Sequence, residues 1–270
     1  MEDNLRELQL KEIEILKAFI KVCNDYNLKY YIGGGTLIGA IRHKGFIPWY
    51  DDIDVSMPRE DYEKLLNEYY DKFPSNIKIN HYKFYPEVYF YPAKLMDTNI
   101  TVLERRLEKN EEYTKLSIDV FPLDGFPNGK IQQQIYKFKY YYYRMLIGFC
   151  NVDILRTTVK RKLHERILIK FAKIFNLNKK MNLNKIRNKF DRFLKKYKID
   201  DCNLIGGISG AYGIKEFVPK DYFGEGKILS FEGMDVNAPS KAEEYLTHMY
   251  GDYMTLPPEE ERTTGHIKIV

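Results

Sequence analysis

The first part of the chain changes from a helical to a strand-like hydrophobic pattern and back. Residues 3–27 carry apolar side chains at helical spacing with charges between them, which predicts an amphipathic helix. A short β-prone run at residues 29–32 ends in three consecutive glycines. Residues 36–42 then predict a short helix whose N-terminus opens on that glycine turn.

Strand patterns dominate the remainder of the first half. Residues 52–57 alternate polar and apolar side chains, and Pro58 suits the first turn of a following helix. The sequence Pro-Leu-Asp-Gly at residues 122–125 predicts a turn that ends a strand. The first half is therefore predicted to be a mixed α/β sheet, with further strands at 77–82, 88–96 and 116–121.

The second half begins with a long helical pattern and returns to mixed patterns near the C-terminus. Neither Pro nor Gly interrupts the helical periodicity between Phe149 and Asp200. A strand pair around residues 227–236 and a short helix at 240–250 follow. We predict three parts, which are a catalytic core at 1–129, a basic helical region at 130–198, and a C-terminal segment at 199–270 that completes the core.

The amino-acid composition argues for a globular protein and against several other classes. The chain has 270 residues, of which 44% are apolar, so it can bury a hydrophobic core. Its three cysteines, Cys23, Cys150 and Cys202, are odd in number, far apart and without metal-like spacing, which argues against a disulfide framework or a zinc site, so a reducing cytoplasm is expected. The N-terminus is acidic and no apolar stretch has the length of a membrane span, so secretion and membrane insertion are not expected.

The formal net charge of +5 conceals a strong asymmetry along the chain. Residues 130–198 hold 20 Lys and Arg against 3 Asp and Glu, a net charge of +17, while the parts before and after carry −5 and −7. Such a block favours a polyanion, whether nucleic acid, an anionic membrane surface or a phosphorylated polymer. The alternative is a helical face that is simply well solvated.

The chemistry is expected where two acids follow the glycine turn. Asp52 and Asp54 are two residues apart on the predicted strand, so both side chains leave on one face. Mg²⁺ prefers oxygen ligands and usually binds one or two carboxylates together with substrate phosphates. The backbone of Gly34, Gly35 and Thr36 at a helix N-terminus could approach a phosphate closely. Two solvated acids at a strand end are the alternative.

Cationic side chains lie between the glycine turn and the acids. Arg42 is the first candidate to neutralise phosphate oxygens that the metal does not contact, and Lys44 is the second. His43 is more often an ordinary loop histidine, since nothing else in the sequence marks it as a base.

The segment IGGGTLIGAIRHKGFIPWYDDIDVSMPREDYEKL, residues 32–65, closely resembles the signature of the LicD family of phosphocholine transferases. The resemblance continues at SIDVFPLDGFP, residues 117–127, and at YGDYMTLPPEEERTTGH, residues 250–266. It implies a nucleotidyltransferase-like fold, a divalent metal such as Mg²⁺ or Mn²⁺, and transfer of phosphocholine from CDP-choline or a related CDP-alcohol to a sugar hydroxyl. Family members often read WDDDID where this chain has Tyr50 as the first residue of the acidic run.

The resemblance also implies further site residues. Nucleotidyltransferase-like sites add a third carboxylate, for which Asp119 is the candidate, as metal ligand and as general base. Its rival, Asp124, reads first as a turn residue. Arg262 and His266 match the family pattern and either close over the phosphates or belong to a tail that attaches itself to the sheet. Trp49, with Tyr50 beside it, could hold the quaternary ammonium group of choline.

These features together predict a cytoplasmic enzyme that works at the inner face of the membrane. Its expected acceptor is a glycan or lipid-linked glycan of lipopolysaccharide, teichoic acid or capsule. The basic region would make peripheral contact with anionic lipid, and nucleic acid is not expected as a partner. Two alternatives stay open, which are a nucleotide-sugar glycosyltransferase with a DxD metal site and a basic polyanion-binding module without catalytic activity.

Overall fold

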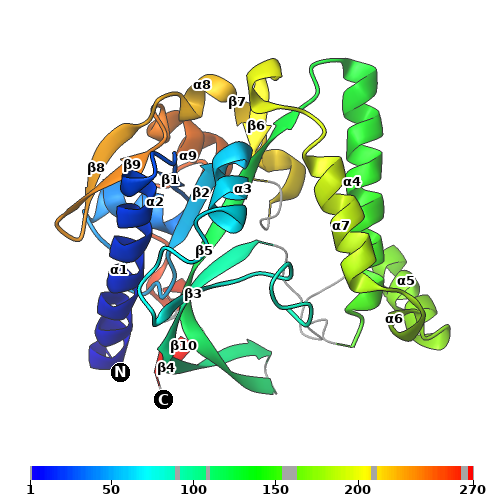
Figure 1. Ribbon diagram of the computed structural model, residues 1–270, viewed down its shortest axis with the longest axis horizontal. Helices are drawn as coiled ribbons and strands as arrows, with labels where there is room; N and C mark the ends of the chain where they lie inside the picture. Colours follow the sequence, from blue (N-terminus) through cyan, green and yellow to red (C-terminus); the bar gives the residue numbers. More distant parts are fainter. Residues whose placement is uncertain are drawn as a thin grey trace.

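The computed structural model has the mixed α/β architecture that the hydrophobic pattern predicts, with a sheet flanked by helices (Figure 1). It describes residues 2–88, 92–107, 110–153, 163–207, 212–262 and 267–269.

A strongly branched sheet forms the centre of the molecule. Its main path runs through β1 (Tyr31–Ile32), β2 (Asp54–Pro58), β5 (Asn110–Phe126), β4 (Ala93–Leu107) and β10 (Ile267–Ile269). Strand β2 pairs in parallel with β5, whereas the other pairs in the described sheet are antiparallel. Three short strands branch from this path: β3 (Ile77–Asn80) on β4, β6 (Leu204–Gly206) on β5, and β7 (Val218–Pro219) on β6.

Helices from both ends of the chain cover this sheet. The amphipathic helix α1 (Glu2–Asp25) packs against β4, β5 and β10 (Figure 1). Apolar side chains of α1, including Leu8, Leu16 and Phe19, are fully buried in the main core. The other elements around the sheet are α2 (Gly34–Arg42), α3 (Arg59–Asn67), η2 (Gly213–Glu216), α8 (Lys220–Phe223), the hairpin β8 (Lys227–Phe231) and β9 (Met234–Ala238), α9 (Ala242–Tyr250) and η3 (Glu259–Glu261).

The basic region forms a helical extension at the side of the molecule opposite α1 (Figure 1). It consists of α4 (Lys130–Cys150), α5 (Leu163–Ile174), α6 (Leu177–Lys180) and α7 (Leu183–Leu194), and η1 (Ile199–Asp201) leads back to the sheet. A second apolar core joins α4 and α7 to the end of β5 through Phe126, Tyr136, Tyr140, Phe190, Leu194 and Phe217. Within the described residues, no helix is long and apolar enough to cross a bilayer.

Two sequence-based expectations need correction. The predicted turn at residues 122–125 is wrong, because β5 continues through them to Phe126. Pro122 and Leu123 pair with β2, while Asp124 and Gly125 pair with β6, so tertiary partners extend the strand. The strand predicted at 52–57 begins at Asp54. The strand predicted at 88–96 begins at Ala93, and residues 89–91 lie outside the described residues.

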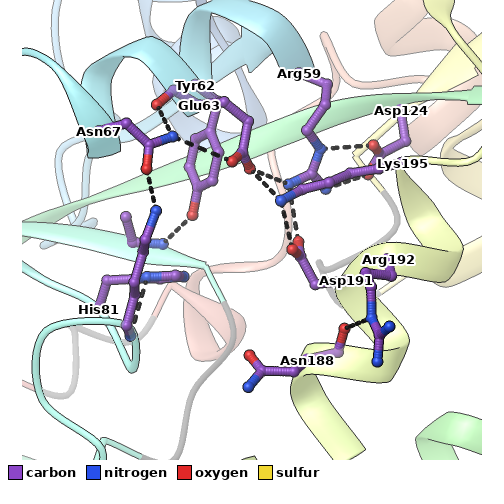
Figure 2. A network of polar contacts seen from close by, with 12 residues as sticks. Arg59, Tyr62, Glu63, Asn67, His81, Asp124, Asn188, Asp191, Arg192 and Lys195 are labelled. Carbon is purple, nitrogen blue, oxygen red and sulfur yellow. Dashed lines mark hydrogen bonds and ion pairs between the residues drawn. The ribbon is translucent and has the colours of Figure 1, made fainter.

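A network of ion pairs fixes the helical extension to the sheet (Figure 2). The guanidinium group of Arg59 donates two hydrogen bonds to Asp124, of 2.7 and 2.6 Å, and both side chains are buried. Arg59 also reaches Asp191 of α7 at 3.2 Å, and Lys195 bridges Asp191 and Glu63. Helix α3, strand β5 and helix α7 therefore meet at one charged centre.

Asp124→Asn tests this centre as a structural element. The substitution removes the shortest ion pair of the buried Arg59 and leaves only its longer contacts with Asp191 and Glu63, so we expect the free energy of unfolding to fall by about 2 kcal/mol. Urea denaturation followed by circular dichroism measures this change. Asp221→Asn is the matched control, because Asp221 pairs with Lys241 on the exposed surface and its loss should leave the midpoint unchanged. An unchanged midpoint for Asp124→Asn would contradict the structural role.

Candidate functional site

The glycine turn and the start of β2 hold each other in place. The backbone N–H of Gly33 donates to the carbonyl oxygen of Asp54 at 3.0 Å. In return, the N–H of Asp54 donates to the hydroxyl oxygen of Thr36 at 2.9 Å, and Thr36 is buried. Asp54 is therefore fixed beside the N-terminus of α2, and the Thr36 hydroxyl has a structural partner.

Gly34 and Gly35 allow side chains of the site to approach the backbone closely. Gly34 has a φ of +50°, and a Cβ at this position would collide with the carboxylate of Asp54. A Cβ at Gly35 would lie 2.6 Å from the ring of Tyr50. Gly33 differs, because its φ is −134° and a Cβ there would meet only ordinary contacts. Glycine is thus required at 34 for both the backbone conformation and the space.

Two of the three predicted acids face each other across adjacent strands. In the parallel pairing of β2 with β5, Asp54 lies opposite Asp119, and the N–H of Asp119 donates to the carbonyl of Ile53 at 2.9 Å. On the other side of β5, Lys94 of β4 pairs with Asp119, and its Nζ lies 2.6 Å from Asp119 Oδ1. Asp52 is exposed just ahead of β2.

Burial and crowding of like charges mark this site electrostatically. Burial raises the pKa of Asp54 well above its usual range, and the charges of Asp52 and Asp119 raise it further, while Lys94 opposes them. Glu12 of α1 is completely buried, and neither of its carboxylate oxygens has a hydrogen-bond partner among the described residues. Its pKa is also raised, first by burial and then by the neighbouring aspartates.

The charges of this site fit a divalent cation. Among the described residues, no group of three or more Asp, Glu, His or Cys side chains is placed to hold a metal ion by itself. A facing pair of carboxylates with a third acid close by nevertheless suits Mg²⁺, which fills its other positions with phosphates and water. Burial is the main cause of the raised pKa of Asp54 and Glu12, and the neighbouring carboxylates add to it.

The two predicted cations after the glycine turn, Arg42 and Lys44, have different surroundings. Arg42 donates from Nε to His43 and from Nη1 to the carbonyl of Tyr253 at 2.8 Å, and no described carboxylate pairs with it. Burial lowers the pKa of Arg42, and the nearby charge of Arg262 lowers it further. Lys44 is exposed in a turn with a φ of +58°, where its carbonyl accepts from the N–H of Glu232.

The C-terminal segment returns to the sheet. Strand β10 pairs with β4, as expected for a tail that attaches itself to the sheet. The guanidinium group of Arg262 lies over the ring of Trp49, 5.5 Å from its centroid, and its Nε donates to the carbonyl of Pro257. One face of Trp49 is thus already occupied by a cation. His266 lies outside the described residues.

Two tyrosines, Tyr212 and Tyr250, lie together near one further acid, Glu216. The rings of Tyr212 and Tyr250 meet edge to face at 5.5 Å, and the N–H of Tyr212 donates to Glu216 Oε1 at 3.0 Å. Burial raises the pKa of Glu216 to about 7. Burial is also the main cause that raises the pKa of Tyr250, to which Tyr245, Asp54 and Glu216 contribute through their charges. This aromatic group therefore adjoins the carboxylate site.

Some of these residues could have been recognised from the sequence and others could not. Glu12 interrupts the apolar stripe of α1 between Leu8 and Leu16, which is a readable signal for a buried acid. Lys94 and Glu216 have no comparable signal, because their positions depend on strand pairing and on a loop distant in sequence.

Comparisons with known proteins identify the family of the chain. The family model described as LicD/FKTN/FKRP, nucleotidyltransferase domain, matches residues 27–146, which include the glycine turn and all three predicted acids. The lipopolysaccharide cholinephosphotransferase LicD of Haemophilus influenzae is 34% identical over 268 residues, covering 98% of this chain and 96% of the relative. An uncharacterized protein of Rickettsia typhi is 36% identical over 59 residues, which is 21% of this chain and 19% of that protein. The chain belongs to the LicD family.

Proposed function

We propose that this protein transfers phosphocholine from CDP-choline to a hydroxyl group of lipopolysaccharide or a related cell-surface glycan. The name of the Haemophilus influenzae relative, which matches along nearly the whole chain, supports phosphocholine transfer as the reaction. The observation that carries the proposal is the pairing of Asp54 with Asp119 beside the glycine turn. Such a site can hold a diphosphate donor between a metal and backbone N–H groups.

Asp54 and Asp119, with Asp52 close by, would hold Mg²⁺ or Mn²⁺. When bound, the metal would supply charge stabilisation at the phosphoryl oxygens. Asp119 is the proposed general base for the acceptor hydroxyl, and Lys94 fixes the position of its Oδ1. The N-terminus of α2 at Gly34 and Gly35 offers N–H groups to the donor phosphates.

Arg42 and Arg262 are the proposed partners for donor oxygens that the metal does not contact. Their guanidinium groups lie near each other, and like charges in one place favour an anion between them. Lys44 is a second candidate from the exposed turn after α2. His266 remains a candidate on sequence grounds alone.

The trimethylammonium group of choline needs aromatic faces and a carboxylate, because it cannot donate hydrogen bonds. We favour Tyr212, Tyr250 and Glu216 for this role over Trp49, whose ring already faces Arg262. The charges of Glu216 and Asp54 influence each other, so the aromatic group lies near the phosphate end of the site. A phosphocholine group would then lie between the two sets of residues.

The same proposal specifies the acceptor of the phosphocholine group and the place in the cell where the transfer occurs. A lipid-linked glycan precursor at the inner face of the membrane would bring its hydroxyl to a protein with a strongly basic region. The protein would then work from the cytoplasm as a peripheral enzyme, with teichoic acid and capsule precursors as further acceptors of the same chemical kind.

A donor screen tests this function directly. The protein is incubated with a lipopolysaccharide acceptor, Mg²⁺ and, in separate reactions, CDP-choline, CDP-ethanolamine, CDP-glycerol and CDP-ribitol. We expect release of CMP and labelling of the acceptor with CDP-choline, and loss of both after chelation of the metal. Transfer from a nucleotide sugar, with none from any CDP-alcohol, would favour a glycosyltransferase and contradict the proposal.

Gly34→Ala tests the geometry of the glycine turn. The new Cβ would displace the Asp54 carboxylate and strain a φ of +50°, so we expect kcat to fall at least a hundredfold, as it should for Asp54→Asn. Gly33→Ala is the matched control, because its Cβ fits in ordinary contact and kcat should stay within about threefold of the original protein. Melting temperatures are measured for all variants. Equal kcat values for the two alanine variants would contradict the close approach of Gly34 to Asp54.

The raised pKa of Glu216 predicts a pH dependence of donor preference. A carboxyl group with a pKa of about 7 gains its negative charge as the pH rises from 6 to 8. The KM for CDP-choline should therefore fall over this range relative to the KM for CDP-glycerol, whose head group is neutral. Glu216→Gln should remove this change in the ratio, and a ratio that changes equally in both proteins would exclude Glu216 from choline binding.

A further inference from the structure

Helix α4 has apolar side chains on two opposite faces. One face packs on α7 and includes the buried Tyr136 and Tyr140. The opposite face carries Ile131, Ile135 and Phe138, which are 79%, 51% and 73% exposed. Because these residues follow one another at intervals of four and three, they form one continuous stripe along the helix. Large apolar side chains at this level of exposure mark an interaction surface.

Helix α5 repeats this arrangement. Leu163, Ile167, Phe171 and Ile174 have the same helical spacing and are 72%, 59%, 47% and 63% exposed. The opposite side of α5 is held in place by Ala172, which is fully buried in a small core with the end of α4. The exposed stripe is therefore a property of a packed helix, and it lies at the end of the helical extension that is far from α1 (Figure 1).

Basic side chains flank both stripes. Arg166, Lys170 and Lys173 lie to one side of the α5 stripe, at helical positions between the apolar face and the buried face. Helix α4 carries the exposed Lys139 beside its stripe, at the position after Phe138. The stripes belong to a region with a net charge of +17.

We infer that the exposed apolar stripes of α4 and α5, with their flanking basic side chains, bind the surface of a bilayer rich in anionic lipid, and we call the two stripes together the lipid-binding face. An amphipathic helix with apolar side chains on one face and Lys or Arg beside them lies in the interface between headgroups and acyl chains. The apolar residues would enter the acyl boundary, while the basic residues meet lipid phosphates.

Charge complementarity favours this partner over the other candidates. A second copy of the chain would bring two regions of +17 together, and their repulsion opposes an apolar contact. Nucleic acid would satisfy the positive charge but leaves Ile131, Phe138 and Ile167 in water. An anionic bilayer uses both the charge and the apolar area. The face lies outside the carboxylate site, so its failure in a test would leave the proposed transfer reaction unaffected.

Co-sedimentation of the full chain with vesicles tests this face. We expect binding at low salt to vesicles of phosphatidylcholine mixed with phosphatidylglycerol, and weak binding to vesicles of phosphatidylcholine alone. Raising the salt concentration should weaken the binding, because the Debye length shortens. Absence of binding to the anionic vesicles at low salt would overturn the inference.

Two double variants separate the apolar and charged contributions. Ile167→Ser with Phe171→Ser should lower the partition coefficient roughly tenfold or more, since two exposed apolar side chains no longer enter the bilayer. Lys170→Glu with Lys173→Glu should lower it by a similar factor at low salt. These side chains are on the surface, so melting temperatures should change little.

Ile228→Ser is the matched control, because Ile228 is 62% exposed on β8, outside the helical extension. Its vesicle binding should equal that of the original protein. Equal binding of the Ile167 and Phe171 double variant would mean that charge acts without the apolar face and would overturn the inference. Self-association in solution that this double variant abolishes would assign the face to a second copy and would overturn it as well.

Discussion

The parallel pairing of β2 with β5 is the constraint on which the rest of the site depends. It brings Asp54 and Asp119 to directly opposite positions on neighbouring strands, and two carboxylates so placed repel each other. The protein compensates only in part, since Lys94 from the next strand pairs with Asp119 while Asp54 and Glu12 retain strongly raised pKa values. These carboxyl groups are costly to ionise in this environment, and a bound cation would favour their charged form.

The glycine turn and strand β2 are joined by hydrogen bonds in both directions. Reciprocal hydrogen bonds join Gly33 and Thr36 to the backbone of Asp54, so α2 and β2 cannot shift independently. Gly34 brings the N-terminus of α2 close to the carboxylate, which puts N–H donors and an acid within one small volume. In this chain each part of the glycine turn and strand therefore determines the position of another.

The helical extension packs on the sheet despite its high positive charge. Its Lys and Arg residues repel one another, yet the extension is fixed to the sheet by the buried pair of Arg59 with Asp124 and by Asp191. An apolar core of aromatic side chains, including Tyr136 and Phe190, supports this contact. Other apolar side chains of α4 and α5 are exposed, so the extension has one side that packs on the protein and one that faces solvent.

The sequence by itself determined those features that depend on near neighbours in the chain. Helical periodicity located α1 and the helices of the basic region, the three glycines located the turn before α2, and the spacing of Asp52 and Asp54 indicated a site. Interactions within a few residues control each of these features, so a local pattern is enough to predict them.

Only the tertiary structure decided which distant groups meet. Asp124 reads as a turn residue from its neighbours, but Arg59 and strand β6 make it a buried strand residue with a fixed ion partner. Trp49 is predicted to contact choline from its neighbours in the sequence, and only the fold shows that Arg262, more than two hundred residues later, lies over one face of its ring. Lys94 and Glu216 reach the site through strand pairing and loop packing, and contacts between distant segments leave no periodic trace in the sequence.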